Sequence, residues 1–265
     1  MGSKLGTIKC SCWARKLYSF RAQQENFIDN SFDPIISYGI HAAINHYSAT
    51  PETDIAIEPG NFLLADTGGH YYEGTTDTTR TIVMGSVNDE QKKYFTAVLR
   101  GMLNLGNAKF RYGCTGVNLD YLARGPLWEM GQDFNHGTGH GVGYLLNVHE
   151  GPNSFRWRII QGENAVLEEG MITSDEPGYY VENQYGIRHE NLLVCKKAEK
   201  TSFGQFMCFE HLTMVPFDLD AVVPELMTMQ ERALLNNYHA QVYKKISPYL
   251  EEEEKEWLKE ATREI

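Results

Sequence analysis

Two aspartates with similar surroundings are the first residues in this chain that could do chemistry together. Asp66 follows the apolar run 61–65, and Asp77 lies shortly before a second apolar run, 81–84. A Gly-Gly pair between the runs supplies turn residues, so we expect both aspartates on neighbouring strands of a bent hairpin. An ionised carboxylate is costly to bury without a partner, and an acidic pair beside a β-ribbon therefore favours a bound cation. Asp is also common in turns, so these residues alone leave a purely structural role open.

Three further residues could complete such a cation site. His140 lies in a glycine-dense segment, Glu176 precedes Pro-Gly, and Glu190 lies within a strand expected over 185–194. Taken singly, each has an ordinary interpretation: a flexible turn, a turn residue, and a surface partner of Arg188. The glycine-dense segment also lacks the lysine and the glycine spacing of a phosphate-binding loop. Together with the two aspartates, however, these residues supply four carboxylates and one imidazole.

This ligand set indicates a particular kind of chemistry. Oxygen-rich ligands with one histidine suit Mn²⁺, Co²⁺ or Zn²⁺ better than a metal that prefers thiolates. Four carboxylates crowd a single ion, whereas two ions roughly 3.5–4 Å apart can share bridging carboxylates and hold a water molecule between them. Such a site lowers the pKa of the water and polarises a carbonyl oxygen, which is what amide hydrolysis requires. The pattern therefore predicts a dinuclear metal centre.

The composition limits the classes of protein to which the chain can belong. A net charge of -11 over 265 residues argues against nucleic acid as a partner, because phosphate binding needs clustered Lys and Arg. No apolar run approaches the roughly 20 residues that span a bilayer, so no membrane is expected as a partner. The five cysteines are scattered, which favours a reducing compartment and hence a cytoplasmic location.

Hydrophobic periodicity and turn residues predict one mixed α+β domain. Strands are expected over 34–39, 61–65, 81–84 and 185–194, and helices over 88–110, 118–128 with a kink at Pro126, 228–245, and from Ser247 onward. His46 is expected near a strand end. The basic segment 1–19 is expected to be an irregular leader or the edge of a truncation, followed by the catalytic domain over 20–265.

Five sequence blocks occur in the order and spacing found in one family. They are Asp66 to Asp77 with Gly74-Thr-Thr-Asp-Thr-Thr-Arg80, His136-Gly-Thr-Gly-His140, Asn147-Val-His149-Glu-Gly-Pro152, Asp175-Glu176-Pro-Gly178, and Gly186-Ile-Arg188-His-Glu190. The chain resembles the Xaa-Pro aminopeptidases (aminopeptidase P) of the pita-bread metallopeptidase superfamily, from about Phe20 to the C-terminus. The resemblance implies the pita-bread fold, which is a curved, mostly antiparallel sheet covered by helices.

The resemblance also implies roles for individual residues. Two divalent ions, with Mn²⁺ expected and Zn²⁺ or Co²⁺ as alternatives, would be held by Asp66, Asp77, His140, Glu176 and Glu190. Asp77 and Glu190 would bridge the ions, and Glu176 would also carry protons. Arg188 would support the site, and substrate would be held by His46, His136 and His149. Glu210 is placed near the pocket, although the spacing makes Glu190 the better ligand.

The implied reaction is hydrolysis of the N-terminal Xaa-Pro peptide bond by a metal-bridging hydroxide. The substrate would be a peptide with proline at its second position, and His149 would stabilise the tetrahedral intermediate. A prolidase that acts on Xaa-Pro dipeptides is the close alternative. A truncated or inactive pita-bread domain that serves as a binding module is another.

Two departures from the family pattern carry expectations of their own. His189 stands where the family usually has an aliphatic residue, and strand alternation points it away from Arg188 and Glu190, so we expect an effect on packing alone. Full-length members carry one or two further domains before the catalytic one, which shape the substrate entrance and the dimer. We therefore expect an exposed apolar face and a raised KM for this chain, and the resemblance is compatible with a homodimer.

Overall fold

Antiparallel pairing organises the strands of the computed structural model, which describes residues 8–265. One sheet of the N-terminal half has the order β2-β3-β6 and a smaller one the order β1-β4-β5. Their strands are β1 (Phe27–Asn30), β2 (Ile35–Tyr38), β3 (Asn61–Thr67), β4 (Gly69–Tyr71), β5 (Gly74–Thr75) and β6 (Thr78–Met84). The hairpin predicted over 61–84 is present, because β3 and β6 pair from Asn61 opposite Met84 to Thr67 opposite Thr78. Strands β4 and β5 are an excursion between these two paired strands.

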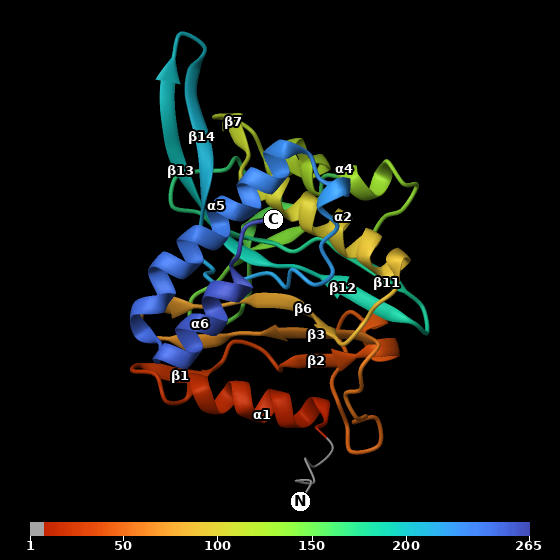
Figure 1. Ribbon diagram of the computed structural model, residues 1–265. Coiled ribbons are helices and arrows are strands. Elements are labelled where there is room, and N and C mark those ends of the chain that lie inside the picture. The colour runs from red at the N-terminus through yellow and green to blue at the C-terminus, as the bar shows by residue number, and fades with distance from the viewer. Residues whose placement is uncertain (1–7) are drawn as a thin grey trace, which may run out of the picture.

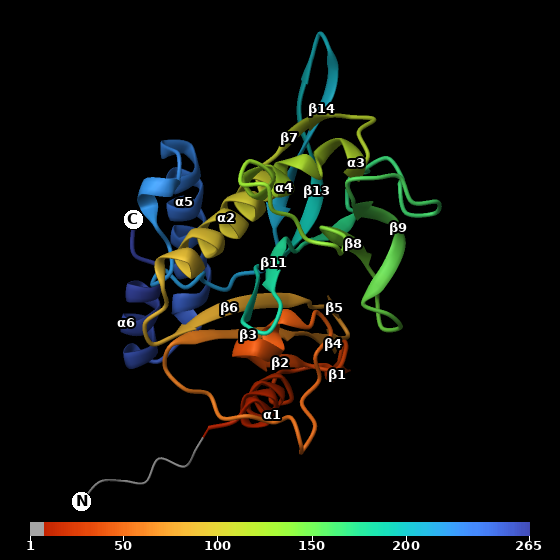
Figure 2. The ribbon, with the colours of Figure 1, turned by 90° about the vertical axis from the view of Figure 1, so that its right-hand side faces the viewer.

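The C-terminal half contributes a larger sheet and a two-stranded ribbon. The larger sheet has the order β7-β14-β13-β10-β8-β9, and the ribbon consists of β11 and β12. Their bounds are β7 (Lys109–Arg111), β8 (Gly139–Val142), β9 (His149–Phe155), β10 (Ile172–Asp175), β11 (Gly178–Val181), β12 (Tyr185–Arg188), β13 (Asn191–Thr201) and β14 (Gly204–His211). The far end of the β13–β14 hairpin projects beyond the body of the molecule (Figure 1). Figure 2 shows β8 and β9 on the same side of the molecule as β4 and β5.

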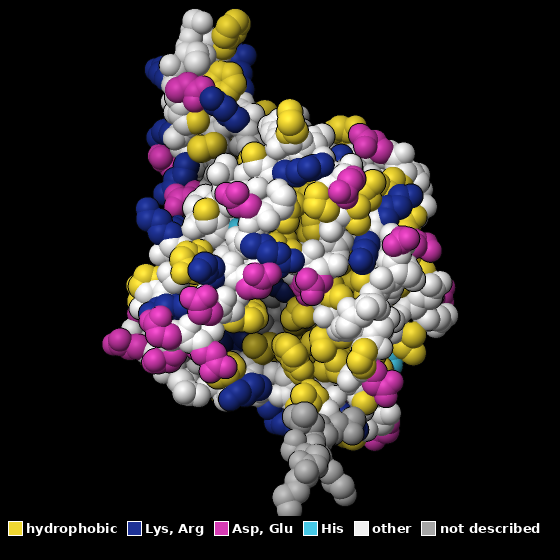
Figure 3. All heavy atoms as spheres, in the orientation of Figure 1, with side chains coloured by type: hydrophobic (Ala, Val, Ile, Leu, Met, Phe, Trp, Pro, Cys, Tyr) yellow, Lys and Arg dark blue, Asp and Glu magenta, His cyan; other side chains and the backbone are white. Residues whose placement is uncertain are grey.

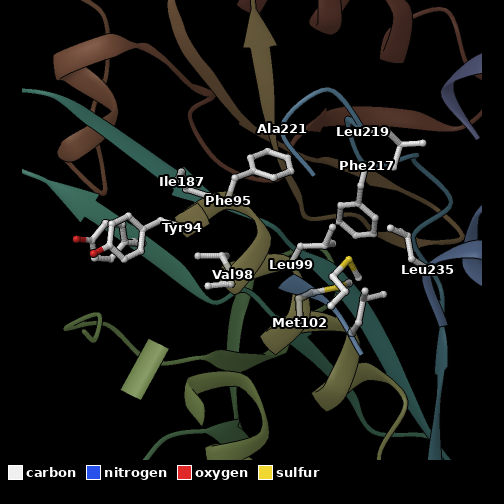
Figure 4. Packing of buried hydrophobic residues seen from close by; sticks show 14 of the residues in the cluster. Tyr94, Phe95, Val98, Leu99, Met102, Ile187, Phe217, Leu219, Ala221 and Leu235 are labelled. Carbon is white, nitrogen blue, oxygen red and sulfur yellow. The ribbon is translucent and has the colours of Figure 1, made fainter. Parts of the chain in front are cut away.

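Helix α2 (Asp89–Gly106) forms the centre of the main hydrophobic core. Its start is the predicted capping box, in which Asn88 accepts a hydrogen bond from the backbone of Gln91 and the Gln91 side chain accepts one from the backbone of Asn88. Phe95 of this helix stacks on Phe62 of β3, so the helix packs directly against the sheet that carries Asp66. Figure 4 shows α2 side chains beside residues of β12, α5 and the segment before α5.

The remaining helices follow the predicted pattern with local differences. The helix expected over 118–128 is divided into α3 (Gly116–Leu119) and α4 (Tyr121–Trp128). Helix α5 (Met229–Ile246) begins with the predicted capping box between Thr228 and Glu231. The helix expected from Ser247 is only a short 3₁₀ turn there, and α6 (Glu252–Ala261) begins later. Glutamates of the acidic run fill the first turn of α6, where the helix dipole favours negative charge.

The expectation of an irregular leader over 1–19 is wrong for residues 10–19. These residues belong to helix α1 (Cys10–Arg21), which crosses the boundary expected at residue 20. Cys10 is fully buried, and Trp13, Ala14 and Leu17 complete an apolar stripe at helical spacing that packs on the N-terminal sheet. Basic residues between these positions concealed the stripe. Residues 1–7 lie outside the described part of the chain.

Two other local expectations are corrected. The strand expected over 185–194 is interrupted, because β12 ends at Arg188 and β13 begins at Asn191. Glu190 therefore lies at the point where the chain passes from the β11–β12 ribbon to the large sheet. His46 follows a 3₁₀ helix (η1, Gly39–Ala43) rather than a strand end. Among residues 8–265 no helix is long and apolar enough to cross a membrane.

An apolar groove with a volume of about 1060 Å³ lies on the face of the β2-β3-β6 sheet that carries α1. Its walls include Trp13 and Leu17 of α1, Ile82 of β6, Phe217, and Trp257 of α6. Hydrophobic side chains gather around this region in the lower half of Figure 3.

Candidate metal centre

Three of the predicted ligands come within reach of a single ion. One ligand atom from each of Asp77, His140 and Glu190 can be chosen so that all three atoms lie within 4.8 Å of one another. Asp77 precedes β6, His140 is on β8, and Glu190 lies between β12 and β13. Residues far apart in the sequence therefore meet because two sheets and a ribbon end at the same place.

The other two predicted ligands lie beside this group. Glu176, between β10 and β11, has its Oε1 3.4 Å from Nε2 of His140, and Oδ2 of Asp77 lies at the same distance from that nitrogen. Asp66 at the end of β3 is buried, and its Oδ1 has no hydrogen-bond partner among the described residues. All five residues line one cavity of about 660 Å³.

The orientation of His140 fits a metal ligand. Its Nδ1 lies 2.9 Å from the backbone oxygen of Gly141, and because a carbonyl only accepts, Nδ1 carries the proton. In the neutral ring that a metal ligand requires, the lone pair is then on Nε2, which faces the carboxylates of Asp77 and Glu176. A lone pair directed at two carboxylates is unfavourable unless a cation lies between them, and a backbone hydrogen bond to the other nitrogen is the usual support of a metal-bound histidine.

The carboxylates themselves also fit a positively charged occupant. Burial raises the pKa values of Asp77 and Glu190 well above their usual range, and the charges of neighbouring carboxylates act in the same direction. Burial likewise raises the pKa of Glu176, although His140 and Arg188 oppose the change. Without a cation, these groups resist ionising together. Two divalent ions would remove that conflict, so the donor set fits a dinuclear centre.

Hydrogen bonds from neighbouring side chains orient the carboxylates. Thr79 donates to Oε2 of Glu190 at 2.7 Å, and Ser174 donates to Oε1 of Glu176 at 3.0 Å. Arg188 donates from Nη2 to Oδ2 of Asp66 at 2.5 Å, which is the supporting contact that the resemblance implied for this arginine. The sequence prediction missed Thr79 and Ser174. The available signal was the position of Thr79 two residues after Asp77, which is the spacing that returns to the same face of a strand.

The predicted substrate-binding histidines line the same cavity but differ in their surroundings. Nδ1 of His136 donates to the backbone oxygen of Gly137, and Nε2 lies 2.9 Å from the Tyr180 hydroxyl, which therefore donates to it. Burial is the main cause that lowers the pKa of His136 to about 3. The ring of His149 packs edge to face on that of His140, with 4.0 Å between centroids. Desolvation and the neighbouring histidines lower the pKa of His149 to about 4, so it is neutral at pH 7.

Two residues differ from the sequence expectations: Tyr180 was not predicted to belong to the site, and Glu210 was predicted to lie near it. Tyr180 links His136 to Arg188, whose Nη1 donates to the same hydroxyl at 2.9 Å, and no sequence spacing indicated this contact. Glu210 lies on β14 opposite Val194 and is not among the residues that line the cavity. The expectation that Glu210 lies near the pocket is therefore wrong.

The glycines around His140 are required by close strand packing. A Cβ atom on Gly139 would lie 1.8 Å from the backbone oxygen of Ser174, and one on Gly141 would lie 2.0 Å from that of Glu150. Both distances are far below van der Waals contact. The segment is therefore not the flexible turn that its composition alone allowed, but part of a strand held against its neighbours.

The chain belongs to metallopeptidase family M24. The family model matches residues 8–197, and the model of the C-terminal region of this family matches residues 205–265. The α+β architecture expected from the sequence, with the pita-bread fold, is confirmed by these matches and by the solved structures below.

Within this family, the chain is similar to enzymes that are named for cleavage next to proline. The chain is 45% identical to a probable Xaa-Pro aminopeptidase P from Arthroderma otae, and the alignment covers 100% of this chain and 42% of that protein. It is also similar to the structure of an X-prolyl aminopeptidase from Caenorhabditis elegans, described as a cytosolic enzyme with a dinuclear active site. That match has a TM-score of 0.91 and 37% identity, and it covers 98% of this chain and 43% of the other. A prolidase from Pyrococcus furiosus matches with a TM-score of 0.63 and 32% identity over 71% of this chain and 53% of the other. The chain thus spans less than half the length of the curated relative and of the aminopeptidase structure.

Proposed function

We propose that this chain is the catalytic part of an Xaa-Pro aminopeptidase that uses two divalent metal ions. The observation that carries the proposal is the meeting of five candidate ligands, Asp66, Asp77, His140, Glu176 and Glu190, in one cavity. The oxygen-rich donor set supports Mn²⁺ as the metal, with Zn²⁺ and Co²⁺ as alternatives. Asp77 and Glu190 would bridge the ions, as the resemblance implies, and both are buried with ligand atoms close to each other and to His140.

The bound ions would supply an activated water molecule and a Lewis acid for the scissile carbonyl. The residues around them have separate tasks. Glu176 takes up a proton from the attacking water and passes it to the leaving nitrogen of proline, a role supported by its raised pKa and its hydrogen bond to Ser174. His149 is neutral at pH 7 and lines the cavity beside His140, so it can donate a hydrogen bond to the oxyanion of the tetrahedral intermediate.

The other polar residues of the cavity hold the substrate and the ligands. His46 lies on the same cavity wall and is a donor for the peptide. His136 has both nitrogens engaged, so a substrate group that binds its Nε2 must displace the Tyr180 hydroxyl. Arg188 keeps Asp66 in place and neutralises part of its charge. Proline at the second position matters because its tertiary amide has no N–H and its φ is fixed, which excludes contacts that other aminopeptidases use.

A prolidase that acts on dipeptides is the second candidate, and one observation favours it. Arg156 lies on the cavity wall, donates from Nε to Glu163 at 2.5 Å, and packs its Nη1 side over Gly137. Its charge reaches far enough to lower the pKa of His149. A guanidinium at this place can pair with the free carboxylate of a dipeptide.

The location and the assembly are part of the same proposal. All five cysteines are free thiols, and the similar enzyme from Caenorhabditis elegans is described as cytosolic, which supports a cytoplasmic location. A homodimer is supported only by resemblance to the family.

The proposal is tested by metal analysis together with peptide hydrolysis. After Mn²⁺ loading and desalting, we expect about two ions per chain, as a dinuclear site requires, and release of the first residue from an Xaa-Pro-Xaa tripeptide. Hydrolysis of the Xaa-Pro dipeptide alone would favour the prolidase. Two bound ions without hydrolysis of either peptide would contradict the enzymatic assignment and favour a binding module.

A further inference from the structure

A single arginine, Arg80, donates hydrogen bonds to several backbone segments that meet near Glu190. Arg80 on β6 is buried, and its guanidinium donates to oxygen atoms of several segments. The acceptors are the backbone oxygens of Thr79 (2.8 Å), Glu190 (2.5 Å), Val215 (2.7 Å) and Pro216 (3.1 Å), Oδ1 of Asn191 (2.7 Å) and the hydroxyl of Tyr238 (3.1 Å). The guanidinium carbon also lies 4.0 Å from the ring centre of Phe217.

This buried charge lacks a carboxylate of its own. Among residues 8–265, no carboxylate oxygen lies within 4.0 Å of the Arg80 guanidinium. The buried Arg124 and Arg188, in contrast, each pair directly with an aspartate. Burying an unpaired charge is expensive. Arg80 therefore depends on neutral oxygens for its solvation, and it fixes the positions of the segments that provide them.

The junction between β12 and β13, which contains Glu190, is held in place by these hydrogen bonds. The Glu190 N–H donates to the backbone oxygen of Thr79 at 3.0 Å, and the Glu190 backbone oxygen accepts from Arg80. Thr79 also holds the Glu190 carboxylate. Both backbone groups and the side chain of Glu190 are thus bound by two consecutive residues of β6, the strand that Asp77 precedes.

We infer that Arg80 is a positioning residue that sets the place of Glu190 relative to Asp77, and that metal affinity depends on it. The inference rests on the dinuclear site of the proposed function. A guanidinium suits this task because its planar fork presents five N–H groups at fixed angles, which can reach acceptors on several segments at once. The ammonium group of lysine has three donors on a flexible stem and cannot span the same acceptors.

The contacts of Arg80 extend to the C-terminal helix α5. The Tyr238 hydroxyl lies 3.0 Å from the backbone oxygen of Thr213 and 2.8 Å from that of Val215, while it accepts from Arg80. Tyr238 therefore braces the guanidinium at Nη2, the nitrogen that also donates to Asn191. Substituting Tyr238 loosens Arg80 without altering any ligand.

The test is the affinity of the metal-free protein for Mn²⁺, measured by titration calorimetry. Residues that support metal ligands typically contribute 10- to 100-fold to metal affinity, so Arg80→Lys is expected to weaken binding of at least one ion by about that factor. Tyr238→Phe is expected to weaken it by about 3- to 10-fold, since it removes one brace only. Arg100→Lys is the matched control, because Arg100 is a largely buried arginine that pairs with Glu231 between α2 and α5. It should bind both ions as the wild type does.

A double variant separates positioning from general loss of structure. Glu190→Gln keeps one oxygen that can contact an ion, so residual Mn²⁺ binding is expected. If Arg80 acts through Glu190, Arg80→Lys should weaken this residual binding by less than about 2-fold, because coupled effects do not add. If Glu190→Gln binds no Mn²⁺, Tyr238→Phe decides. The full single-variant loss in that background, or wild-type affinity in Arg80→Lys, overturns the inference. If Arg80→Lys does not fold, Tyr238→Phe decides in its place, and wild-type affinity in that variant overturns the inference. A wild-type chain that binds no Mn²⁺ contradicts the proposed function instead.

Discussion

Replacing His189 with leucine is a direct test of how the core behind the metal centre is built. His189 is fully buried, and neither ring nitrogen has a hydrogen-bond partner among the described residues. Its ring packs edge to face with Phe95 at 4.4 Å and with Phe217 at 5.5 Å between centroids. Burial lowers its pKa to about 3, with the charge of Arg80 acting in the same direction and the Phe95 backbone opposing. The side chain is thus a polar group in an apolar place.

The expected gain follows from these contacts. A buried polar group without a partner costs about 1–3 kcal/mol, of which weak contacts between N–H groups and aromatic faces recover only a part. Leucine has a similar volume, and imperfect fit of such a replacement costs less than about 1.5 kcal/mol. We therefore expect His189→Leu to stabilise the protein by about 1–2 kcal/mol at pH 7. At about 2–4 °C per kcal/mol for a chain of this size, Tm should rise by about 2–8 °C.

The gain should increase in mild acid. The folded-state pKa of His189, about 3, lies below the unfolded value of about 6.5. Between these values the unfolded chain binds a proton that the folded chain does not, so stability is complete above pH 6.5 and is lost as the pH falls. At pH 5, about 1.5 units below the unfolded pKa, the extra advantage of leucine is about 2 kcal/mol.

Thermal and urea unfolding of the metal-free protein at pH 7 and pH 5 measures both effects without a contribution from metal binding. His239→Leu is the matched control, since His239 is equally buried but its Nε2 accepts a hydrogen bond from the Phe217 backbone at 3.0 Å. This control should lose about 1–3 kcal/mol at pH 7 because it leaves that N–H unpaired. Destabilisation of both variants, or a His189→Leu gain that is the same at both pH values, would refute this account of His189.

Three further variants test the metal centre. Asp77→Ala should lose both ions, since a bridging ligand serves each of them, and elemental analysis that shows wild-type metal content would contradict the bridging role. His149→Ala should keep the ions and reduce kcat on the order of 10²–10³, the range for removal of one transition-state donor, and an unchanged kcat would exclude His149 from the mechanism. Gly139→Ala places a methyl group 1.8 Å from the Ser174 oxygen and should cost about 1–3 kcal/mol or more, as overpacking does. An unchanged Tm in Gly139→Ala would show that the contact at Gly139 is not tight.

Local chemistry explains which elements could be predicted from the sequence. The β3–β6 hairpin and the starts of α2 and α5 follow from turn residues and capping boxes that lie within a few positions of each other. Helix α1 was missed because its stripe of Cys10, Trp13 and Leu17 is narrow and is interrupted by basic residues. The break at Glu190 was missed because strand-forming residues lie on both sides of it, at Tyr185 to Ile187 and at Leu192 to Val194. Only contacts with β6, more than a hundred residues earlier, show that the strand ends there.

The candidate ligands could be proposed from the sequence because their residue types carry the chemistry, whereas their supports could not. A carboxylate or imidazole in a motif is visible in the chain, but Arg80 and Tyr180 have ordinary side chains at unremarkable positions. Their roles depend on acceptors supplied by other segments after folding. The glycines near His140 were interpreted from the sequence as turn residues. In the structure they allow neighbouring strands to approach closely.

The same arrangement links metal binding to the stability of the fold. Asp77, Glu176 and Glu190 are buried with raised pKa values, and Asp175 next to them is fully buried with no partner for either oxygen among the described residues. The two nearby arginines do not pair with these carboxylates, because Arg188 is paired with Asp66 and Arg80 donates to neutral oxygens. Without a cation, these carboxylates therefore keep their protons to higher pH in the folded chain than in the unfolded chain. Divalent cations replace those protons, so their binding favours the folded state and releases protons as it does so. Metal ions at the proposed site would thus help to hold this end of the two sheets together.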